Sequence, residues 1–380
     1  MTATDRPKLS NRDHFPYRAV IGVGGIGSGL LLALEGNHDL GRNESRPARL
    51  MPGRDYCKLH IITHYLAALL DANGSGSSFH VLPIGKVGND SEGLRLKTEM
   101  ADIGMDTEYV ETAEGKPTLF SICYQYPDQT GGNITTSESA ASFLTNKDID
   151  QIIPLLESYG NGWIALAVPE APLEVRHHLL ELATSYQGFR VASFTSAEIE
   201  EARTVDIFSD IDLLAINEDE AAALIGRAFD PHDPREFLEQ CSVSLTASQP
   251  HIKIVVSAGK DGVFVFADGG WSHFATLPVK AISTAGAGDA LLAGILTGLI
   301  LGRPFISHTS LSDSGTARLF GSAIDLGILL ASFSVTSPHT IHPDASMSSL
   351  LEFAGDLGLT FTDDLSQIPT EDDLTLRNAL

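Results

Sequence analysis

Short apolar strands alternate with longer segments of helical spacing along most of this chain, and this order limits the fold more than any other feature. The strand candidates are rich in β-branched and apolar residues and cover residues 19–23, 79–84, 163–168, 189–193, 213–216 and 252–257. Between them lie helical segments such as 60–70, 92–103 and 173–183. This alternation is typical of parallel βαβ units. It predicts an α/β fold whose central, mostly parallel sheet carries helices on both faces.

Two regions depart from the alternation. Residues 252–257 and 263–267 flank a glycine-containing turn and predict a hairpin. Residues 30–50 begin as an extended segment and then become rich in Gly, Asn, Arg and Pro, while residues 118–126 alternate apolar and polar side chains. Together these two segments predict a small sheet that covers one end of the main sheet.

The domain organisation follows from these assignments. We expect one domain over residues 17–360, with a lid from about residues 30–52 and 107–136. A polar segment, residues 1–16, precedes the domain, and an acidic peripheral tail, residues 361–380, follows it. A chain of 380 residues is long enough for one large α/β domain or two smaller ones.

Composition excludes several classes of function. The formal net charge of −24 argues against binding to nucleic acid or to anionic membranes. The three cysteines are too few and too scattered for a disulfide framework or a zinc site. The N-terminal residues contain no apolar signal region, and no apolar stretch has the ~18 residues of a membrane span. The sequence therefore predicts a cytoplasmic protein.

The segment Ser283-Thr284-Ala285-Gly286-Ala287-Gly288-Asp289 follows an extended run and leads into an apolar helical run. Small residues let backbone N–H groups approach a bound anion, and a helix N-terminus attracts negative charge. Beside such an anion site, Asp289 has the chemistry to take a proton from a hydroxyl while the amides hold a phosphoryl group. The alternative is that Asp289 caps its own helix.

A second polar motif, Asn217-Glu218-Asp219-Glu220, directly follows the strand 213–216. Open α/β sheets bind ligands at the carboxyl ends of their strands. Glu220 is suited to hold Mg²⁺ through water, because Mg²⁺ gives up its water ligands reluctantly. The alternative is structural: Asn217 and Glu220 also fit a capping box that opens a helix.

Four further motifs are weaker. Residues 85–93 predict a strand–turn–helix junction. Ser257, Gly259 and Gly262 mark a hairpin turn that can lie beside a phosphate or a ring, or can be a plain turn.

Residues 22–27 match a dinucleotide fingerprint, but the long polar loop that follows argues against dinucleotide binding. His60 and His64 have zinc-ligand spacing without a third ligand in the sequence, which favours packing or solvation.

Taken in order, residues 85–93, Asn217-x-x-Glu220, Gly286-Ala287-Gly288-Asp289 and residues 334–338 resemble the ribokinase-like (PfkB) family of carbohydrate kinases. The resemblance covers roughly residues 17–355. It implies a mostly parallel sheet flanked by helices, with a small β lid over the sugar site. It also implies ATP and Mg²⁺ as cofactors, and it allows a homodimer formed through the lid.

The resemblance also assigns roles to residues. Asp289 is the expected catalytic base, and the amides of Ala285, Gly286, Ala287 and Gly288 are expected to hold the transferring phosphate. Asn217 and Glu220 would organise Mg²⁺ and the ATP phosphates. Ser257, Gly259 and Gly262 would lie near the nucleotide. The expected substrate-binding residues are Gly53, Arg54, Asp55, Asn133 and Asp289.

The acceptor motifs depart from the family pattern. Glycine occupies position 27, near where members carry an Asp after the first strand, and Pro52-Gly53-Arg54-Asp55-Tyr56-Cys57 replaces the Gly-Gly-x-x-x-Asn motif. Gly131-Gly132-Asn133 lacks the sugar-binding Glu of the ribokinase branch. Ser283 replaces an Asp of the monovalent-cation site, which puts a requirement for that cation in doubt.

These observations predict an ATP-dependent kinase that phosphorylates a hydroxyl of a small sugar or sugar-like acceptor other than plain ribose. Charges at Arg54, Asp55 and Lys58 suggest a charged or unusual polyol, although a surface loop would explain them equally well. A nucleoside kinase and a non-catalytic, ligand-sensing relative remain the alternative functions.

Overall fold

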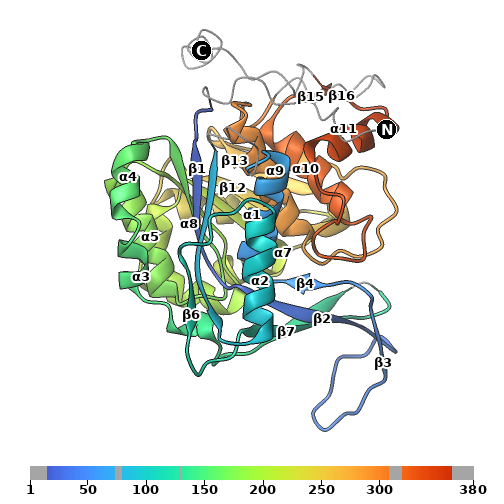
Figure 1. Cartoon of the computed structure of the whole chain (residues 1–380). Coiled ribbons are helices and arrows are strands. Elements are labelled where there is room, and N and C mark those ends of the chain that lie inside the picture. Colours follow the sequence, from blue (N-terminus) through green and yellow to red (C-terminus); the bar gives the residue numbers. More distant parts are fainter. Residues whose placement is uncertain (1–14, 73–78, 129, 308–318, 362–380) are drawn as a thin grey trace, which may run out of the picture.

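A nine-stranded sheet forms the centre of the structure (Figure 1), a computed structural model that describes residues 15–72, 79–128, 130–307 and 319–361. The strand order is β14-β13-β12-β11-β10-β9-β1-β5-β6. In chain order these strands are β1 (Ala19–Val23), β5 (His80–Gly88), β6 (Val110–Ala113), β9 (Trp163–Ala167), β10 (Phe189–Ala192), β11 (Leu213–Asn217), β12 (Lys253–Ser257), β13 (Val263–Ala267) and β14 (Gly270–Phe274). All neighbours from β6 to β12 pair in parallel, whereas β13 and β14 pair antiparallel. The predicted fold class and the predicted hairpin are confirmed.

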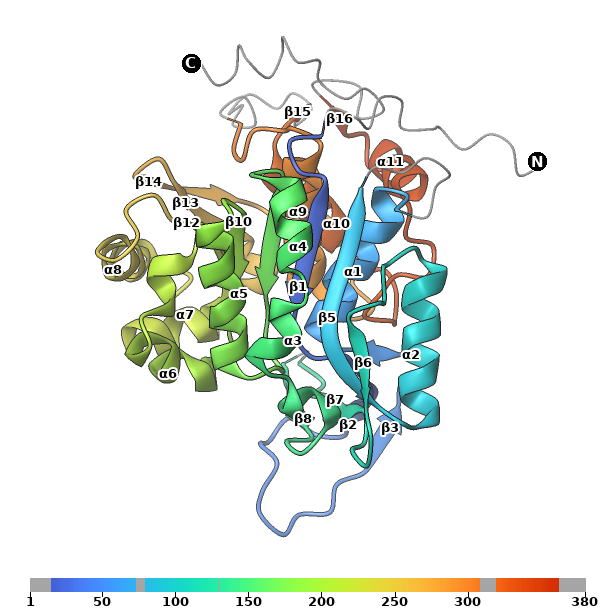
Figure 2. The same cartoon turned by 60° about the vertical axis from the view of Figure 1, so that its left-hand side comes forward.

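Helices cover both faces of this sheet, as Figure 2 shows. One face carries α1 (Lys58–Leu69), α2 (Ser91–Asp102), α9 (Ala287–Ile300), α10 (Ala323–Ser334) and α11 (Met347–Asp356). The other carries α3 (Asn146–Asp150), α4 (Ile153–Tyr159), α5 (Leu173–Ser185), α6 (Ile199–Thr204), α7 (Glu218–Ile225) and α8 (Arg235–Thr246). A short parallel pair, β15 (Leu319–Phe320) and β16 (Thr360–Phe361), lies beside α11. Within the described residues, none of these helices has the length and apolar character needed to cross a bilayer.

The central strands are buried on both faces, which explains their continuous apolar runs. Along β1, Val20 packs into the core on the α1 face, whereas Ala19 and Ile21 pack into the core on the α5 face. Successive side chains of a strand point to opposite faces, so each central strand contributes to two hydrophobic cores.

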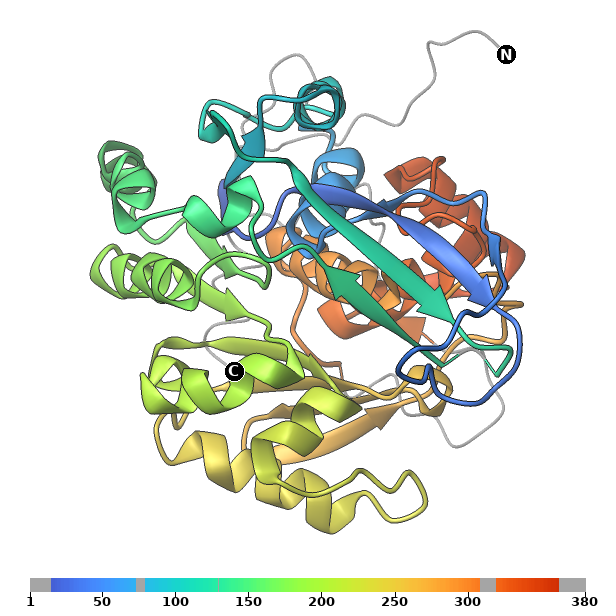
Figure 3. The ribbon, with the colours of Figure 1, turned by 90° about the horizontal axis from the view of Figure 1, so that it is seen from below.

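A second, smaller sheet lies across one end of the main sheet (Figure 3). It consists of β3 (Ala48–Leu50), β2 (Gly27–Leu34), β7 (Leu119–Gln125) and β8 (Gly131–Thr135), and the two-residue strand β4 (Asp55–Tyr56) pairs with β2. This arrangement agrees with the expected small sheet. The expected range 107–136 was too wide, however, because β6 within it pairs with β5 at the edge of the main sheet.

The dinucleotide fingerprint at residues 22–27 has a structural explanation. The segment joins β1 directly to β2, so no helix N-terminus follows the glycines. A Cβ atom on Gly25 would lie 2.4 Å from the Cβ of Glu170, and the Gly25 amide donates to the Pro169 carbonyl at 3.0 Å. These glycines therefore allow two chain segments to pack closely. The polar segment lies outside the described residues up to position 14, and the acidic tail does so from position 362.

Candidate functional site

Polar residues from several elements meet at the carboxyl ends of the parallel strands. There they line a hollow, called here the strand-end hollow, formed by Lys58, Ser193, Ala215, Ile216, Asn217, Glu220, Val255, Ser257, Gly288, Asp289, Leu291 and Leu292. This edge of an open α/β sheet is where such folds bind ligands. The structure thus brings together Asn217, Glu220, Ser257, Gly288 and Asp289, all of which were predicted site residues.

The glycine turn before α9 is shaped by the segment at residues 334–340. Gly286 has φ +77°, and a Cβ atom there would lie 2.8 Å from the Thr340 carbonyl oxygen, so only glycine fits without strain. The Ile282 amide donates to the Val335 carbonyl at 2.7 Å. The turn is therefore fixed in place before the helix begins, and Asp289 falls in the first turn of α9.

The backbone amides of the turn are not equally available to an anion. The Ala287 amide donates to the Thr284 carbonyl at 3.2 Å, and the Ala285 amide donates to Ser283 Oγ at 3.3 Å. Gly288, in contrast, lines the strand-end hollow at the N-terminus of α9. A helix N-terminus carries partial positive charge, so the electrostatics at the Gly288 end of the hollow are favourable for an anion.

Asp289 forms an ion pair with Lys58, the first residue of α1. The Lys58 Nζ atom lies 2.7 Å from Asp289 Oδ1. The two side chains are 28% and 12% exposed, so the pair is largely shielded from water. Burial lowers the pKa of Lys58, but Asp289 and Glu220 raise it by more, so the ammonium keeps its charge.

Asn217 and Glu220 form the capping box at the start of α7 that the sequence left as the structural alternative. Asn217 Oδ1 accepts from the Glu220 amide and Glu220 Oε2 accepts from the Asn217 amide, both at 2.8 Å. Burial raises the pKa of the Glu220 carboxyl, and the nearby Lys58 ammonium partly opposes that shift. Both residues line the strand-end hollow, so capping and ligand binding are compatible.

The donor set suits Mg²⁺ better than a softer metal. Carboxylate and amide oxygens are the groups that Mg²⁺ prefers, and Mg²⁺ retains several waters when bound. In the described part of the chain, no three His, Cys, Asp or Glu side chains cluster as metal ligands. Glu220 and Asn217 in the strand-end hollow would hold a hydrated Mg²⁺, which would supply positive charge there.

The predicted substrate-binding residues lie in different surroundings. Asp55 is buried on β4 and accepts hydrogen bonds from Ser121 Oγ at 2.8 Å and Cys123 Sγ at 3.1 Å. Asn133 is exposed and stands opposite Cys123 in the register of β8 and β7. Directly opposite residues share a face of a sheet. Asn133 therefore lies on the same face of the small sheet as Cys123, whose thiol contacts Asp55.

Arg54 and Gly53 are placed differently from Asp55. The Arg54 guanidinium is exposed and donates to Glu99 Oε1 of α2 at 2.8 Å. A Cβ atom on Gly53 would lie 2.0 Å from the Pro338 carbonyl oxygen, which makes this glycine a packing requirement. Neither residue lines the strand-end hollow.

The predicted nucleotide-binding residues also differ in whether they line the strand-end hollow. Ser257 ends β12 and lines the hollow. A Cβ atom on Gly262 would lie 2.3 Å from the Phe274 carbonyl oxygen, so the pairing of β13 with β14 explains this glycine. Gly259 has φ +49° and open space around it. It belongs to the turn between β12 and β13, outside the lining of the hollow.

Sequence reasoning missed Glu170, which lies beside the Lys58–Asp289 pair. It follows β9 in the left-handed conformation, at φ +71°, and its Oε2 accepts from the Lys58 amide at 3.3 Å. Burial raises its pKa to about 7, and hydrogen bonding from Cys57 opposes that shift. A carboxylate after a parallel strand was the signal used for Asn217 and Glu220, and the same signal applies to Glu170.

Among the residues that the structure describes, no third metal ligand joins His60 and His64. Both Nδ1 atoms are buried and without a hydrogen-bond partner, and burial lowers the pKa of both imidazoles. The His60 ring packs against Tyr56 with centroids 4.6 Å apart. The packing interpretation agrees with these contacts.

Known proteins match both the sequence and the fold. Residues 68–345 match the family described as pfkB family carbohydrate kinase. Fructokinase from Escherichia coli is 24% identical over an alignment of 281 residues, and the match covers 67% of this chain and 79% of the fructokinase.

Solved structures agree in fold across most of the chain. The structure of Arabidopsis thaliana ribokinase complexed with ribose and ATP matches with a TM-score of 0.62 at 15% identity, over 89% of this chain and 98% of the ribokinase. The nucleoside kinase of Burkholderia thailandensis in complex with inosine matches with a TM-score of 0.64 at 14% identity, over 90% and 99% of the two chains. At these identities the likeness shows the fold. The family match itself spans well over half of the chain, and the chain therefore belongs to the pfkB family of carbohydrate kinases and is a kinase.

Proposed function

We propose that this kinase transfers the γ-phosphoryl group of ATP to a hydroxyl of a small sugar or polyol, with Asp289 as the general base. The observation that carries the proposal is the meeting of Asp289, Gly288, Asn217 and Glu220 in one hollow at the strand ends. A base, an anion-binding helix N-terminus and an oxygen-ligand set are the parts that phosphoryl transfer requires.

The proposed reaction is an in-line displacement. Asp289 takes the proton of the acceptor hydroxyl as its oxygen bonds to the γ-phosphorus, and the bond between that phosphorus and ADP breaks with the electron pair leaving on ADP. The Gly288 amide and the positive end of α9 stabilise charge on the phosphoryl oxygens. Mg²⁺, when bound near Glu220 and Asn217, supplies positive charge that offsets the phosphate charge.

The charges around the acceptor side favour a neutral acceptor over an anionic one. Asp55, Glu170 and Asp289 lie in this region, and Lys58, whose ammonium acts on Glu170 and Asp289, is already paired with Asp289. Arg54 is paired with Glu99 instead. Carboxylates accept hydrogen bonds from hydroxyl groups but repel another carboxylate or phosphate, so a sugar acid or sugar phosphate would bind poorly.

The small sheet supports a homodimer. Its exposed apolar side chains are Leu30, Leu50, Phe120 and Ile134, with exposed fractions of 41%, 59%, 38% and 60%. Exposed apolar patches on a sheet are typical of protein contacts. A mass of two chains in light scattering, returning to one chain in an Ile134→Lys/Leu50→Lys variant, would support this arrangement.

An acceptor panel tests the proposed function. Purified protein with Mg²⁺ and ATP is assayed for ADP release with D-fructose, D-ribose, myo-inositol, inosine and D-gluconate, each also scored by its effect on the melting temperature. We expect a neutral sugar or polyol to give turnover that Asp289→Asn abolishes. Turnover with inosine alone would instead favour a nucleoside kinase. The fold match to the inosine-bound kinase is the observation behind this second candidate function. Turnover that is unchanged by Asp289→Asn would exclude Asp289 as the base.

A further inference from the structure

Lys58 occupies a central position in the strand-end hollow. It is the first residue of α1, and its Nζ atom reaches across to Asp289 Oδ1 at 2.7 Å. The same hollow is lined by Gly288 and Ser257 on the side where phosphate is expected and by Asn217 and Glu220 on the side expected for Mg²⁺. The ammonium therefore contacts the proposed base and lines the same hollow that is expected to take the phosphoryl group.

Lys58 is also the sole basic residue among those that line the hollow in the described part of the chain. The carboxylates whose charges act on it are Asp289, Glu220 and Glu170. One ammonium shared by three carboxylates leaves the hollow acidic, and a phosphate entering such a site needs positive charge in contact with it. The flexible four-carbon stem and three rotatable donors of a lysine allow it to contact two anions at once.

Lys58 donates to one of the two carboxylate oxygens of Asp289. The other oxygen has to face the acceptor hydroxyl during proton transfer. A γ-phosphate carries more negative charge than a carboxylate and offers three terminal oxygens, so it competes well for the remaining donors of the ammonium. Lys58 can thus keep or loosen its contact with Asp289 while it binds the phosphoryl group.

We propose that Lys58 is a catalytic residue that binds the transferring phosphoryl group and links it to the base Asp289. This inference rests on the proposed function and deepens it. Lys58 keeps all its protons throughout: the proton of the acceptor hydroxyl goes to Asp289, and the electron pair of the broken phosphorus–oxygen bond goes to ADP. The ammonium offsets charge on the phosphoryl oxygens and holds the carboxylate beside the line of attack.

Nucleotide binding tests this role without an identified acceptor. Calorimetry gives the Kd of Mg·ADP and of Mg·AMP-PNP, which differ by the γ-phosphate position, for the wild-type protein and for Lys58→Met. We expect the wild type to prefer AMP-PNP and Lys58→Met to lose about tenfold or more of that preference, the effect of one charge-assisted hydrogen bond, with the Kd of ADP nearly unchanged. Lys58→Arg, which keeps the charge, should retain part of the preference.

A double-mutant cycle separates phosphate binding from simple neutralisation of Asp289. If Lys58 serves only to neutralise Asp289, then Lys58→Met should have no effect on the AMP-PNP preference in an Asp289→Asn background. We expect the loss to persist there. Its disappearance in that background, or an unchanged preference in the single variant, would overturn the role of Lys58 while leaving the proposed function intact.

Two controls complete the test. Lys86 also pairs with carboxylates, Asp148 at 2.8 Å and Glu111 at 3.2 Å, but lies on β5 away from the hollow. Lys86→Met should therefore leave the nucleotide preference unchanged, and a loss equal to that of Lys58→Met would contradict the inference. A wild-type protein that binds neither nucleotide would contradict the proposed function and, with it, the role of Lys58.

Discussion

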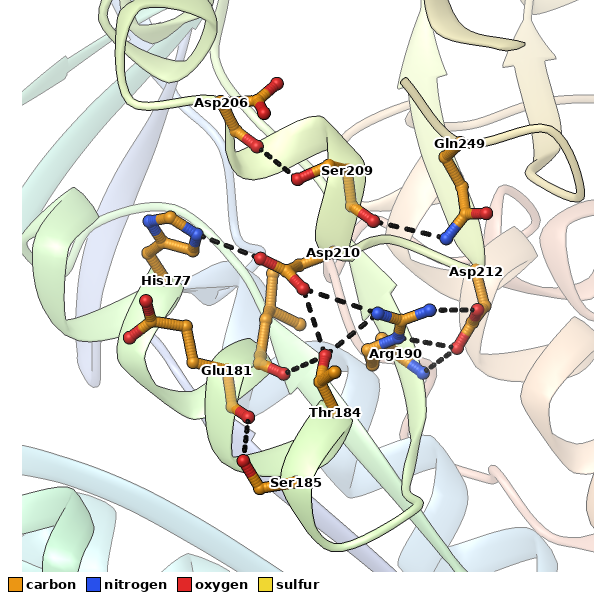
Figure 4. A network of polar contacts seen from close by, with 11 residues as sticks. His177, Glu181, Thr184, Ser185, Arg190, Asp206, Ser209, Asp210, Asp212 and Gln249 are labelled. Carbon is orange, nitrogen blue, oxygen red and sulfur yellow. Dashed lines mark hydrogen bonds and ion pairs between the residues drawn. The ribbon is translucent and has the colours of Figure 1, made fainter. Parts of the chain in front are cut away.

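Two clusters of ionisable side chains in this protein differ in how their charges are balanced. In the Arg190 network, formed by Arg190, Asp212, Asp210, Thr184 and His177, each acidic group has its own donors (Figure 4). The Arg190 Nη2 and Nε atoms donate to the two Asp212 oxygens at 2.7 and 3.0 Å, in the bidentate geometry that guanidinium groups favour. At the Lys58 site, one ammonium faces Asp289, Glu220 and Glu170.

We interpret this difference as that between a structural cluster and the proposed functional site. The Arg190 network joins α5, β10 and the segment before β11, and its polar groups satisfy one another within the fold. The Lys58 site is buried and has more acidic groups than basic ones, and burial raises the pKa of both Glu170 and Glu220. Buried carboxyl groups that outnumber the basic groups around them interact favourably with incoming cations and hydroxyl donors. Such behaviour is a property of ligand sites.

The largest expected difference between the two clusters is in turnover. Asp289→Asn removes the proposed base and should lower kcat by about 10²–10⁴-fold, with circular dichroism and the Kd of Mg·ATP close to wild type. The matched change in the Arg190 network, Asp212→Asn, should lower the melting temperature and leave kcat unaltered. Steady-state kinetics of both variants with the acceptor found in the panel provide the measurement. Equal losses of kcat would mean that the two carboxylates do not differ in role.

The second largest effect should fall on Mg²⁺. A glutamine at position 220 can still accept the Asn217 amide in the capping box, so Glu220→Gln removes charge while keeping the helix start. We expect about 10–100-fold weaker apparent affinity for Mg²⁺, measured as a higher Mg²⁺ concentration for half-maximal activity and for half-maximal thermal stabilisation by ATP. Unchanged Mg²⁺ titrations would show that Glu220 serves only as a cap.

The fold was predictable because its strands are buried on both faces and its helices are amphipathic. Runs such as β1 and β9 are apolar at every position, and the helices between strands carry their apolar residues at helical spacing. The range of the lid was predicted less well. β6 is short and partly exposed, and a sequence pattern of this kind does not distinguish an edge strand of one sheet from a strand of another.

The site was predictable only where sequence-local motifs built it. Gly286 to Asp289 and Asn217 to Glu220 are continuous, and the structure brings them to one hollow. The pairing of Lys58 with Asp289 joins residues 231 positions apart, and no local pattern reports such a contact. Asp55 and Arg54 are neighbours in sequence, yet Asp55 is buried against Ser121 and Cys123 of β7, whereas Arg54, which directly precedes β4, is paired with Glu99 of α2.

A third prediction concerns stability alone. Arg190→Met leaves Asp212 and Asp210 without their guanidinium partner while keeping most of the apolar stem. We expect a loss of about 1–2 kcal/mol in the free energy of unfolding, since the network is partly shielded from water, and no change in kcat or in the Kd of ATP. Urea denaturation and the kinetic assay measure the two effects. A loss of activity without a loss of stability would mean that this network communicates with the site.

The smallest expected effect is a pH dependence of stability that arises from Glu170. Burial raises its pKa to about 7, so between the unfolded-state pKa and that value the folded protein holds a proton that the unfolded chain has released. Its contribution is therefore fully present below about pH 4.5 and is lost as the pH rises through about 7. The glutamine of a Glu170→Gln variant cannot ionise. Between about pH 5 and about pH 8 the free energy of unfolding of this variant should rise by about 1–2 kcal/mol relative to wild type. Asp212→Asn should be destabilising at both pH values, because it removes the negative charge and one of the two oxygens that accept from Arg190. Melting temperatures of the three proteins at the two pH values test this contrast. If the melting temperature of Glu170→Gln changes with pH in the same way as that of wild type, then Glu170 is ionised in the folded protein.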